Sequence, residues 1–395
     1  MNLSLRAFIA LLPVLFVSCT TKNKGNIPLD IHISAVQSKF APDKRVALFQ
    51  VDASEVGGMC ILRGESNLPK AVAELKERLD REKINFVDSI QILPSQELQG
   101  NTQAVVTLSV ANLRGNPKHS AELATQATLG TPVKVLKKKG SWYYIQTPDN
   151  YLSWVDAGGI ELMDNERFEQ WQGTDKLIYT QTYGHAFLGE DEKERVSDLV
   201  AGNVLEVLKY TAKHVVVRFP DGRKALVRNE ETERYADWVK SLDPTVDDLV
   251  FTSQALMGVP YLWGGTSTKG MDCSGFTKTI YFLNGMVIPR DASQQVHTGK
   301  PIDSVQNFDA LQKGDLLFFG TKATDSTQEK VVHVGMWIGN NEFIHASERI
   351  RIGSMDPKAD NFDAWNHDRY LRTKRILKQK DKGLIRLMDT PLFKD

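Results

Sequence analysis

The sequence predicts an α+β fold built from several units, and three observations lead to that prediction. Short runs of alternating polar and apolar residues, separated by turn residues, fill the middle of the chain and are typical of small β-barrels. After residue 243 a helical pattern precedes a group of strongly apolar strands, which indicates a helix packed on an antiparallel sheet. With 395 residues, the chain is long enough for two to four domains.

The composition is that of an ordinary globular protein, with 41% hydrophobic and 25% charged residues. The 49 lysines and arginines balance 49 acidic residues, and the sequence has no basic stripe interleaved with aromatic residues. We therefore expect no nucleic-acid partner. The substrate is expected to be recognised by local contacts and not by a long-range electrostatic field.

Residues 1–18 have the features of a secretory signal peptide. They comprise an early charge at Arg6, the apolar run Ala7–Val17 and the small residue Ser18. The apolar run is interrupted by Pro13 and is too short to span a bilayer comfortably as a permanent helix. We therefore expect this segment to direct export and to be removed.

A cysteine stands directly after this segment. Cys19 and the polar residues that follow it resemble the lipobox of bacterial lipoproteins, although Phe16 occupies the place of the usual leucine. The resemblance implies an exported protein that is anchored through lipid on Cys19, on the periplasmic face of a membrane. Lys22–Ile33 is polar and has no regular pattern, so residues 19–40 are expected to form a tether.

A small α/β unit is expected over residues 41–102. Arg45–Val51 and Phe86–Leu93 have strand character, and Pro69–Lys83 predicts a helix that opens with proline. The helix carries an apolar stripe of Val72, Leu75 and Leu79. Cys60 lies in an apolar run and is expected to be a small buried hydrophobe, because the three cysteines of the chain imply no disulfide framework.

Residues 103–165 and 172–241 are each expected to form a small β-barrel. The first set of strands, with its Asp149–Trp154 turn, resembles bacterial SH3-like barrels, and the second resembles a more degenerate copy. The expected strands of the first barrel are Ala104–Val110, Thr131–Leu136, Trp142–Thr147 and Leu152–Val155. Those of the second are Lys176–Thr182, Val204–Lys209, Val215–Phe219 and Lys224–Val227.

The last unit is expected over residues 243–395. The Asp243-Pro244 step breaks the chain, and Thr245 with Asp248 three residues later is typical of a helix start. A second helix of about three turns is expected from Cys273, because the apolar residues that follow recur at helical spacing as far as Gly285. Strands are expected over Gly314–Gly320, Val331–Gly339 and Glu342–Ala346.

Cys273 thus stands at the start of a helix, behind a glycine-rich loop. Unpaired backbone N–H groups and the positive end of the helix dipole favour a thiolate at such a position, and the thiolate is the nucleophile in cysteine chemistry. A lone cysteine more often only fills space in a core. The polar neighbours Asp272 and Ser274 argue against a wholly apolar pocket and support a reactive role.

Two histidines, His333 and His345, follow on neighbouring expected strands. A nucleophilic cysteine needs a general base, and the base needs a group that orients it, so the pair provides both. A single histidine in a strand is usually a core residue, but two in one hairpin together with Cys273 favour catalysis. A two-residue loop at Asn340-Asn341 would set His345 opposite Met336, so direct contact between the histidines requires a bulge or bend.

Several motifs of the last unit occur in an order that resembles the NlpC-type cell-wall cysteine peptidases, which are circularly permuted relatives of papain. The motifs are Tyr261, Trp263-Gly264-Gly265, Asp272-Cys273-Ser274-Gly275-Phe276, Pro289-Arg290-Asp291, the 314–320 strand, His333-Val334-Gly335 and His345-Ala346-Ser347. With two SH3-like barrels in front, the chain resembles the subgroup of γ-D-glutamyl-L-diamino acid endopeptidases, which act on murein peptides. The resemblance covers nearly everything after residue 40 and implies a papain-like last unit.

The resemblance implies a role for each catalytic residue. Cys273 would attack the scissile carbonyl, His333 would act as base and acid, and His345 would orient the imidazole of His333. The backbone N–H of Cys273 would help to hold the oxyanion. This chemistry requires no cofactor and no metal.

The resemblance also implies which residues contact a murein peptide with a free N-terminal L-alanine, cut between γ-D-glutamate and meso-diaminopimelate or lysine. Four residues match positions that line the substrate groove of the subgroup: Asp272, Ser274, Arg290 and Asp291. Tyr261 and Trp263 match the aromatic wall of that groove. Glu122 and Tyr151 of the first barrel match positions that close the groove at the amino end of the substrate. Asp272 and Glu122 would supply carboxylates for the substrate's ammonium group. Ala292 stands where some relatives have a hydroxyl, so that contact is either missing or moved to Ser293.

Three alternatives remain at this stage. A zinc site built from Cys273, His333 and His345 uses suitable ligand types but lacks paired ligand motifs. A wall-binding lipoprotein with an inactive papain-like unit would not need all three catalytic residues. An amidase or endopeptidase that acts on intact peptidoglycan would need a groove that is open at both ends.

Overall fold

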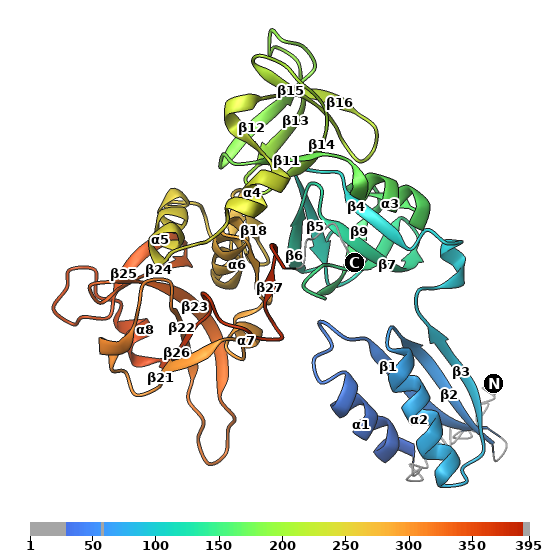
Figure 1. Ribbon diagram of the computed structural model, residues 1–395. Coiled ribbons are helices and arrows are strands. Elements are labelled where there is room, and N and C mark those ends of the chain that lie inside the picture. The colour runs from blue at the N-terminus through green and yellow to red at the C-terminus, as the bar shows by residue number, and fades with distance from the viewer. Residues whose placement is uncertain (1–28, 57–58, 390–395) are drawn as a thin grey trace, which may run out of the picture.

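The computed structural model describes residues 29–56 and 59–389 (Figure 1). The expected signal peptide, Cys19 and the first part of the expected tether lie outside these residues. Four bodies follow one another along the chain, built on sheets of three, seven, seven and six strands. The first barrel contacts the other three bodies, with the N-terminal unit below it and the second barrel above it in the view of Figure 1.

The N-terminal unit packs two helices on one face of its sheet. β2 pairs antiparallel with β1 and parallel with β3, and the buried side chains of both helices face this sheet. The predicted helix at residue 69 is confirmed. Cys60 is only half-buried and carries no disulfide. The elements are α1 (Leu29–Phe40), β1 (Phe49–Val56), β2 (Met59–Ser66), α2 (Pro69–Arg81) and β3 (Phe86–Ile92).

The predicted tether is wrong for residues 29–40, which form α1. The reason is a short apolar stripe: Leu29, Ile33 and Val36 repeat at helical spacing and are buried against the sheet. Polar residues separate these apolar residues, so the helical pattern is not apparent in the sequence. α1 is therefore a structural part of the N-terminal unit.

The first barrel is a seven-stranded sheet with the order β10-β4-β7-β8-β9-β5-β6. The alternation of its strands places one set of apolar side chains in a single interior cluster. The sequence analysis did not separate β5 from β4 and missed β6 and β10. The strands are β4 (Gln103–Val106), β5 (Val110–Arg114), β6 (Leu123–Thr128), β7 (Pro132–Lys139), β8 (Trp142–Gln146), β9 (Leu152–Asp156) and β10 (Ile160–Met163).

The second barrel has the same number of strands, in the order β13-β12-β16-β15-β14-β11-β17. Its strands are β11 (Lys176–Tyr179), β12 (Tyr183–Phe187), β13 (Arg195–Val200), β14 (Val204–Tyr210), β15 (His214–Arg218), β16 (Lys224–Arg228) and β17 (Thr232–Arg234). It is flanked by the helices α3 (Asn165–Gly173) and α4 (Tyr235–Ser241). Short 3₁₀ turns lie at Gln96–Leu98, Ala157–Gly159, Asn229–Glu231 and Phe308–Ala310.

The last unit is an antiparallel sheet covered by the helix that starts at Cys273, which confirms the α+β prediction. The sheet order is β21-β26-β22-β23-β24-β25. The helices are α5 (Val246–Ala255), α6 (Cys273–Leu283), α7 (Ala292–Gln295) and α8 (Ala364–Asp368). The strands are β18 (Thr266–Ser267), β19 (Gly270–Met271), β20 (Met286–Val287), β21 (Lys300–Asp303), β22 (Leu316–Thr321), β23 (Lys330–Gly339), β24 (Glu342–Ser347), β25 (Arg349–Ser354), β26 (Tyr370–Arg375) and β27 (Ile385–Arg386).

Local sequence signals set the start of the catalytic helix and of its neighbour. Thr245 and Asp248 form the predicted capping box at the start of α5. Asp272 caps α6 by accepting a hydrogen bond from the backbone N–H of Gly275. The apolar face of α6 packs in the main core cluster with side chains of β22, β23 and β24.

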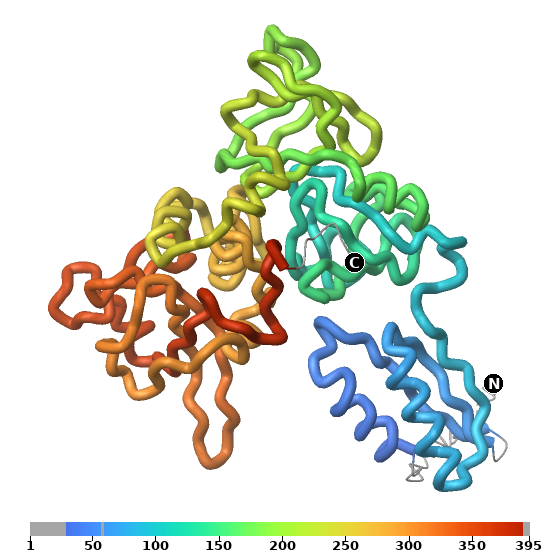
Figure 2. Tube along the Cα trace, in the orientation of Figure 1, coloured from blue at the N-terminus to red at the C-terminus, as the bar shows by residue number. Residues whose placement is uncertain are grey.

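The C-terminal segment returns to the barrels, as the red end of the trace in Figure 2 shows. β27 pairs with β20, and Leu387 is fully buried in an apolar cluster with residues of both barrels. This cluster, which includes Trp171 and Trp238, joins the two barrels to the last unit. Among the described residues no helix is both long and apolar enough to cross a membrane.

Candidate active site

Cys273 is the first residue of α6, as predicted, and its side chain is 7% exposed. Burial raises the pKa of its thiol to about 12, and the charge of Asp272 acts in the same direction. Backbone N–H groups of Val334 and Ser274 and the guanidinium of Arg290 lower this pKa, but they do not offset the burial. The N–H groups at the helix start favour the thiolate, as predicted, but burial acts against them, so a base is needed to remove the thiol proton during the reaction.

His333 and His345 are in direct contact, and a bulge produces that contact. A shift of register between Trp337 and Gly339 pairs Met336 with Ile344. One residue of slip turns a strand's side chains to the opposite face of the sheet, so the bulge brings His345 to the face that carries His333. His333 Nε2 lies 2.8 Å from His345 Nδ1, and both side chains are buried. The expected bulge is confirmed.

The histidine pair lies beside the cysteine. α6 packs on β23, and the N–H of Val334, the residue after His333, is directed at the sulfur of Cys273. Because Nε2 of His333 is engaged by His345, Nδ1 is the nitrogen that remains to accept the thiol proton. Burial lowers the pKa of His333 well below its ordinary value, with His345 adding to the effect, so the imidazole is neutral and can act as a base.

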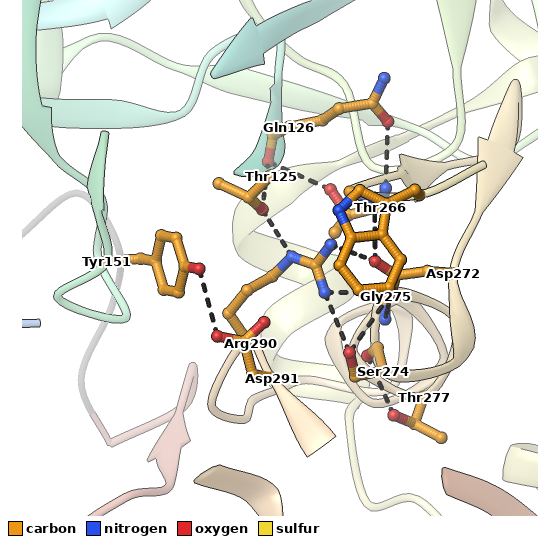
Figure 3. Close-up of polar contacts among 12 residues, drawn as sticks. Thr125, Gln126, Tyr151, Thr266, Asp272, Ser274, Gly275, Thr277, Arg290 and Asp291 are labelled. Carbon is orange, nitrogen blue, oxygen red and sulfur yellow. Dashed lines mark hydrogen bonds and ion pairs between the residues drawn. The ribbon is translucent and has the colours of Figure 1, made fainter. Parts of the chain in front are cut away.

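Arg290 lies under the start of α6 and is 1% exposed. Figure 3 shows its guanidinium between the last unit and the first barrel. Nη2 lies 2.6 Å from Asp272 Oδ2, Nη1 lies 3.0 Å from both Asp272 Oδ1 and Ser274 Oγ, and Nε donates to Thr125 Oγ1 at 2.8 Å. The arginine therefore ties the N-cap of the catalytic helix to strand β6 of the barrel.

Asp272 has no free acceptor capacity. Besides two bonds from Arg290 it accepts hydrogen bonds from the backbone N–H of Gly264 (2.9 Å) and Gly275 (2.7 Å) and from the hydroxyl of Ser274 (3.3 Å). A carboxylate offers about four lone-pair sites, and five donors already approach them. Asp272, Ser274 and Arg290, expected from the sequence to line the groove, are thus buried and bonded to one another, and Asp272 is not placed to take a substrate ammonium.

The remaining expected groove residues lie at the contact between the last unit and the first barrel. The indole Nε1 of Trp263, which is 63% exposed, donates to Glu122 Oε1 at 2.8 Å. The hydroxyl of Tyr151 donates to Asp291 Oδ2 at 3.1 Å, as Figure 3 shows. Tyr261 is half-buried and packs against the core that contains Cys273. Trp263 and Tyr151 therefore each form a bond across the contact between the first barrel and the last unit.

Sequence reasoning missed a contribution from the N-terminal unit. Arg45 Nη1 donates to Asp291 Oδ2 at 2.8 Å and to Ser293 Oγ at 2.9 Å, and its backbone oxygen accepts from the N–H of Leu152 at 2.7 Å. Asp43 accepts from Gln294 Nε2 at 2.8 Å. Residues 43–46 thus lie between the Tyr151 turn and α7 and line a cavity there together with residues of both. No local signal marks this role of Arg45, because Asp291, Ser293 and Leu152 all lie more than a hundred residues away in the chain.

Two further contacts hold the barrel in place, and neither was expected from the sequence. Gln126 Oε1 accepts from the N–H of Thr266 and from the hydroxyl of Ser267, both at 3.0 Å. Lys278 of α6 forms a buried ion pair with Asp149, two residues before Tyr151. The helix that carries the nucleophile is therefore bonded to the turn that carries Tyr151.

The zinc alternative requires Cys273, His333 and His345 to converge on one point. In the parts of the chain that the structure describes, no group of three or more His, Cys, Asp or Glu side chains is arranged to hold a metal ion. The two imidazoles are instead hydrogen-bonded directly to each other. This geometry serves proton transfer.

Comparison with known proteins agrees with this geometry. Residues 258–367 match the NlpC/P60 family, and residues 109–161 match the bacterial SH3 domain. A Bacillus cereus protein named gamma-D-glutamyl-L-lysine dipeptidyl-peptidase is 34% identical over 244 residues, which are 60% of this chain and 71% of that protein. Dipeptidyl-peptidase 6 of Lysinibacillus sphaericus is 27% identical over 64% of this chain and 92% of that protein.

A solved structure of an NlpC/P60 family protein from Bacillus cereus is similar over 70% of this chain and 99% of its own, with a TM-score of 0.57 and 28% identity. The similarity extends beyond the match to the peptidase unit and includes barrel residues. Taken with a cysteine at a helix start and a histidine pair beside it, these similarities show that the chain belongs to the NlpC/P60 family of cysteine peptidases.

Proposed function

We propose that this peptidase hydrolyses the amide between γ-D-glutamate and the following diamino acid in murein peptides that have a free N-terminal L-alanine. The observation that carries the proposal is the joint between the first barrel and the peptidase, where Trp263 bonds Glu122 and Tyr151 bonds Asp291. This joint closes one end of the site. An enzyme with a closed end releases a short product of fixed length, here the dipeptide L-Ala-D-Glu.

The chemistry follows from the residues around the sulfur. His333 takes the thiol proton of Cys273, and the sulfur attacks the γ-carbonyl carbon of the glutamate. The backbone N–H of Cys273 stabilises the oxyanion that forms. His333 then returns the proton to the amino group of the leaving diamino acid, and a thioester remains. Water, deprotonated by the same imidazole, cleaves the thioester and regenerates the thiol.

The closed end recognises the amino terminus through charge. Glu122 is exposed and accepts one bond, from Trp263 Nε1, so acceptor sites remain on its carboxylate for the substrate's ammonium, whereas five donors already approach Asp272. Burial raises the pKa of Tyr151, which therefore keeps its proton for Asp291 and leaves oxygen lone pairs for an ammonium N–H. Acylation of the amine, as in peptide still attached to muramic acid, removes the charge and adds bulk against the barrel.

The test compares kcat/KM for L-Ala-γ-D-Glu-diaminopimelate with that for its N-acetylated form. A charge-assisted contact contributes about 1.5–3 kcal/mol, so acetylation is expected to lower kcat/KM by roughly tenfold to a hundredfold through charge alone, and further through steric block. Glu122→Gln should lower kcat/KM for the free-amine peptide and leave the acetylated peptide nearly unaffected. Glu169→Gln, at an exposed position on α3, is the matched control. Equal rates on both peptides would refute the proposal and favour an enzyme that acts on intact wall.

The diamino acid is the second part of the proposal. The relatives from Bacillus are named for lysine, and a peptide ending in meso-diaminopimelate differs from a lysine peptide by one carboxylate. Mass spectrometry of the products from the two peptides, at equal concentration, determines the preference. Both peptides must yield L-Ala-D-Glu if the bond is assigned correctly.

We also propose export and anchoring through lipid on Cys19. The proposal rests on the apolar segment before Cys19 and on cell-wall relatives. Stable anchoring requires more than one acyl chain, which a lipoprotein's modified cysteine supplies. Cys19→Ala should move the mature protein from the membrane fraction to the soluble fraction. Equal membrane retention of both forms would show that the anchor lies elsewhere.

A further inference from the structure

One buried nitrogen of the catalytic histidine pair has no hydrogen-bond partner. It is Nε2 of His345, a residue whose side chain is fully buried and whose Nδ1 is bonded to His333. A buried polar atom without a partner is costly, and a catalytic role is one explanation for such an atom. The nearest charged atom is Oδ2 of Asp363, at 3.6 Å.

Asp363 is a fixed carboxylate. It is 8% exposed and caps α8, with Oδ1 accepting from the backbone N–H of Asn366 at 3.0 Å. Its Oδ2 accepts from the side-chain amide of Asn366 at 2.7 Å, and Arg351 Nη2 lies 3.6 Å away. Arg369 holds Asn366 in turn through two bonds to the amide oxygen. The carboxylate is therefore held in place next to His345 Nε2.

The position of this carboxylate decides which nitrogen of His345 carries the proton. An acceptor opposite Nε2 favours a proton on Nε2, and Nδ1 of the same neutral ring must then be an acceptor. His333 must consequently donate through its Nε2–H, which leaves Nδ1 of His333 without a proton and able to accept one from Cys273. In the opposite tautomer, Nδ1 of His333 would carry the proton and the thiol would have no base.

We propose that Asp363 is a positioning residue that selects the productive tautomer of the His333–His345 pair. The relay then runs from Cys273 through two imidazoles to a carboxylate. Asp363 contacts neither the sulfur nor the substrate and acts through His345. The titratable and charged groups that face His345 are His333 on β23, Arg351 on β25, and Asp363 and Arg369 at the two ends of α8.

Burial, assisted by two arginines, opposes a positive charge on the ring of His345. Burial lowers the pKa of His345 to about 3, and the charges of Arg351 and Arg369 contribute to that shift. A doubly protonated His345 is thus excluded at neutral pH. The ring stays neutral, so the only variable that Asp363 controls is the tautomer.

Asp363→Asn tests this proposal without removing the helix cap, because asparagine caps helices as well as aspartate. If its amide oxygen keeps the cap on α8, its NH₂ group stands in the place of Oδ2 and donates to His345 Nε2. The variant should then favour the wrong tautomer. The matched control is Asp164→Asn, since Asp164 caps α3 in the same way, through the N–H of Arg167 at 2.8 Å, away from the site.

Three readouts are needed: kcat and KM on the free-amine tripeptide, the pH dependence of Cys273 alkylation by iodoacetamide, and ¹⁵N spectra of the histidine rings. We expect kcat of Asp363→Asn to fall by at least tenfold with KM nearly unchanged, alkylation near pH 7 to slow, and His345 to carry its proton on Nε2 in the wild type but not in the variant. Asp164→Asn should match the wild type in all three.

A wild-type His345 with its proton on Nδ1, or an Asp363→Asn variant with wild-type kcat and alkylation profile, would overturn the proposal. If circular dichroism shows that Asp363→Asn is unfolded, Asp363→Ser keeps a capping oxygen, lacks the carboxylate and gives the same test. The alkylation and ¹⁵N readouts require no substrate. They therefore stand even if the peptide bond assigned above is wrong.

Discussion

The two ends of the site are built in different ways. The catalytic end comes from one unit: Cys273, His333 and His345 lie on α6, β23 and β24 and are almost wholly buried. The end that we propose to be closed is assembled from the N-terminal unit, the first barrel and the peptidase unit, and its contacts are partly exposed. The chemistry therefore depends on the register within one sheet, whereas selectivity depends on how separate units dock. Mutations should be able to damage one end and spare the other.

The largest effect is expected at the catalytic end. Cys273→Ala removes the nucleophile and should reduce kcat by on the order of 10⁴ or more, because only binding and oxyanion contacts remain. The control is Cys60→Ala, which changes a half-buried cysteine in the N-terminal unit and should keep wild-type turnover. A kinetic assay on the tripeptide, with and without a chelator, checks both variants. Substantial turnover by Cys273→Ala, or loss of wild-type activity in the chelator, would contradict the mechanism.

The next largest effect is expected at Arg290, which belongs to both ends. Arg290→Met leaves the buried Asp272 without its cation, and breaking a buried pair in this way costs about 3–5 kcal/mol. Urea unfolding followed by tryptophan fluorescence should show a large decrease in stability. Arg167→Met, which removes a partly exposed pair with Glu161, is the control and should have a far smaller effect. Equal decreases would mean that Arg290 is no more than a surface charge.

A smaller effect is expected from pH, and it separates the ends because only the catalytic end has buried histidines. His345 has a folded pKa of about 3, below its unfolded value of about 6.5. Below pH 6.5 the unfolded chain therefore binds a proton at this position that the folded chain does not bind. The folded state is thus progressively destabilised as the pH falls below 6.5. Between pH 7 and pH 5, protonation of this histidine in the unfolded chain should lower the free energy of unfolding by about 2 kcal/mol. Urea titrations of wild type and His345→Gln at both pH values check this, and an identical pH dependence would contradict it.

The smallest effect is expected at Arg45, in the N-terminal unit. Arg45→Met removes a donor from Asp291 and loosens the support of Tyr151. The pair is partly exposed, so KM for the free-amine peptide should rise only about tenfold, with kcat unchanged. Lys44→Met, at the exposed neighbouring position, should have no effect. A fall in kcat with constant KM would show that the N-terminal unit acts on the catalytic end instead.

The same contrast explains what the sequence could predict. The nucleophile, its helix and the need for a bulge near Asn340 follow from local periodicity, because each depends on residues close together in the chain. The pairing of Arg290 with Thr125, and of Arg45 with Asp291, joins residues 165 and 246 positions apart and has no local signature. Asp363 was missed for the same reason: it is read locally as an N-cap, and only the tertiary fold brings it to His345.

Burial also acts against one effect that the sequence predicts locally. A helix start does favour a thiolate, and N–H groups do approach the sulfur of Cys273, but the surrounding core removes more solvation than these dipoles supply. Similarly, Asp272 matched a groove position, yet five donors from its own unit occupy it. The sequence predicted that Cys273 and Asp272 belong to the site. The protonation of Cys273 and the acceptor sites left on Asp272 depend on packing, which the sequence does not show.

The path of the C-terminal segment bears on the order in which the molecule is made. Leu387 donates its N–H to Gly285 O at 2.9 Å and completes the apolar cluster that joins both barrels to the peptidase unit. A chain that leaves the ribosome or a translocation channel amino terminus first has both barrels complete long before residue 387 emerges. Until then, the apolar residues of the barrels that contact Leu387 remain uncovered by it. The contacts that join both barrels to the peptidase unit are consequently the last ones that a newly made molecule can complete.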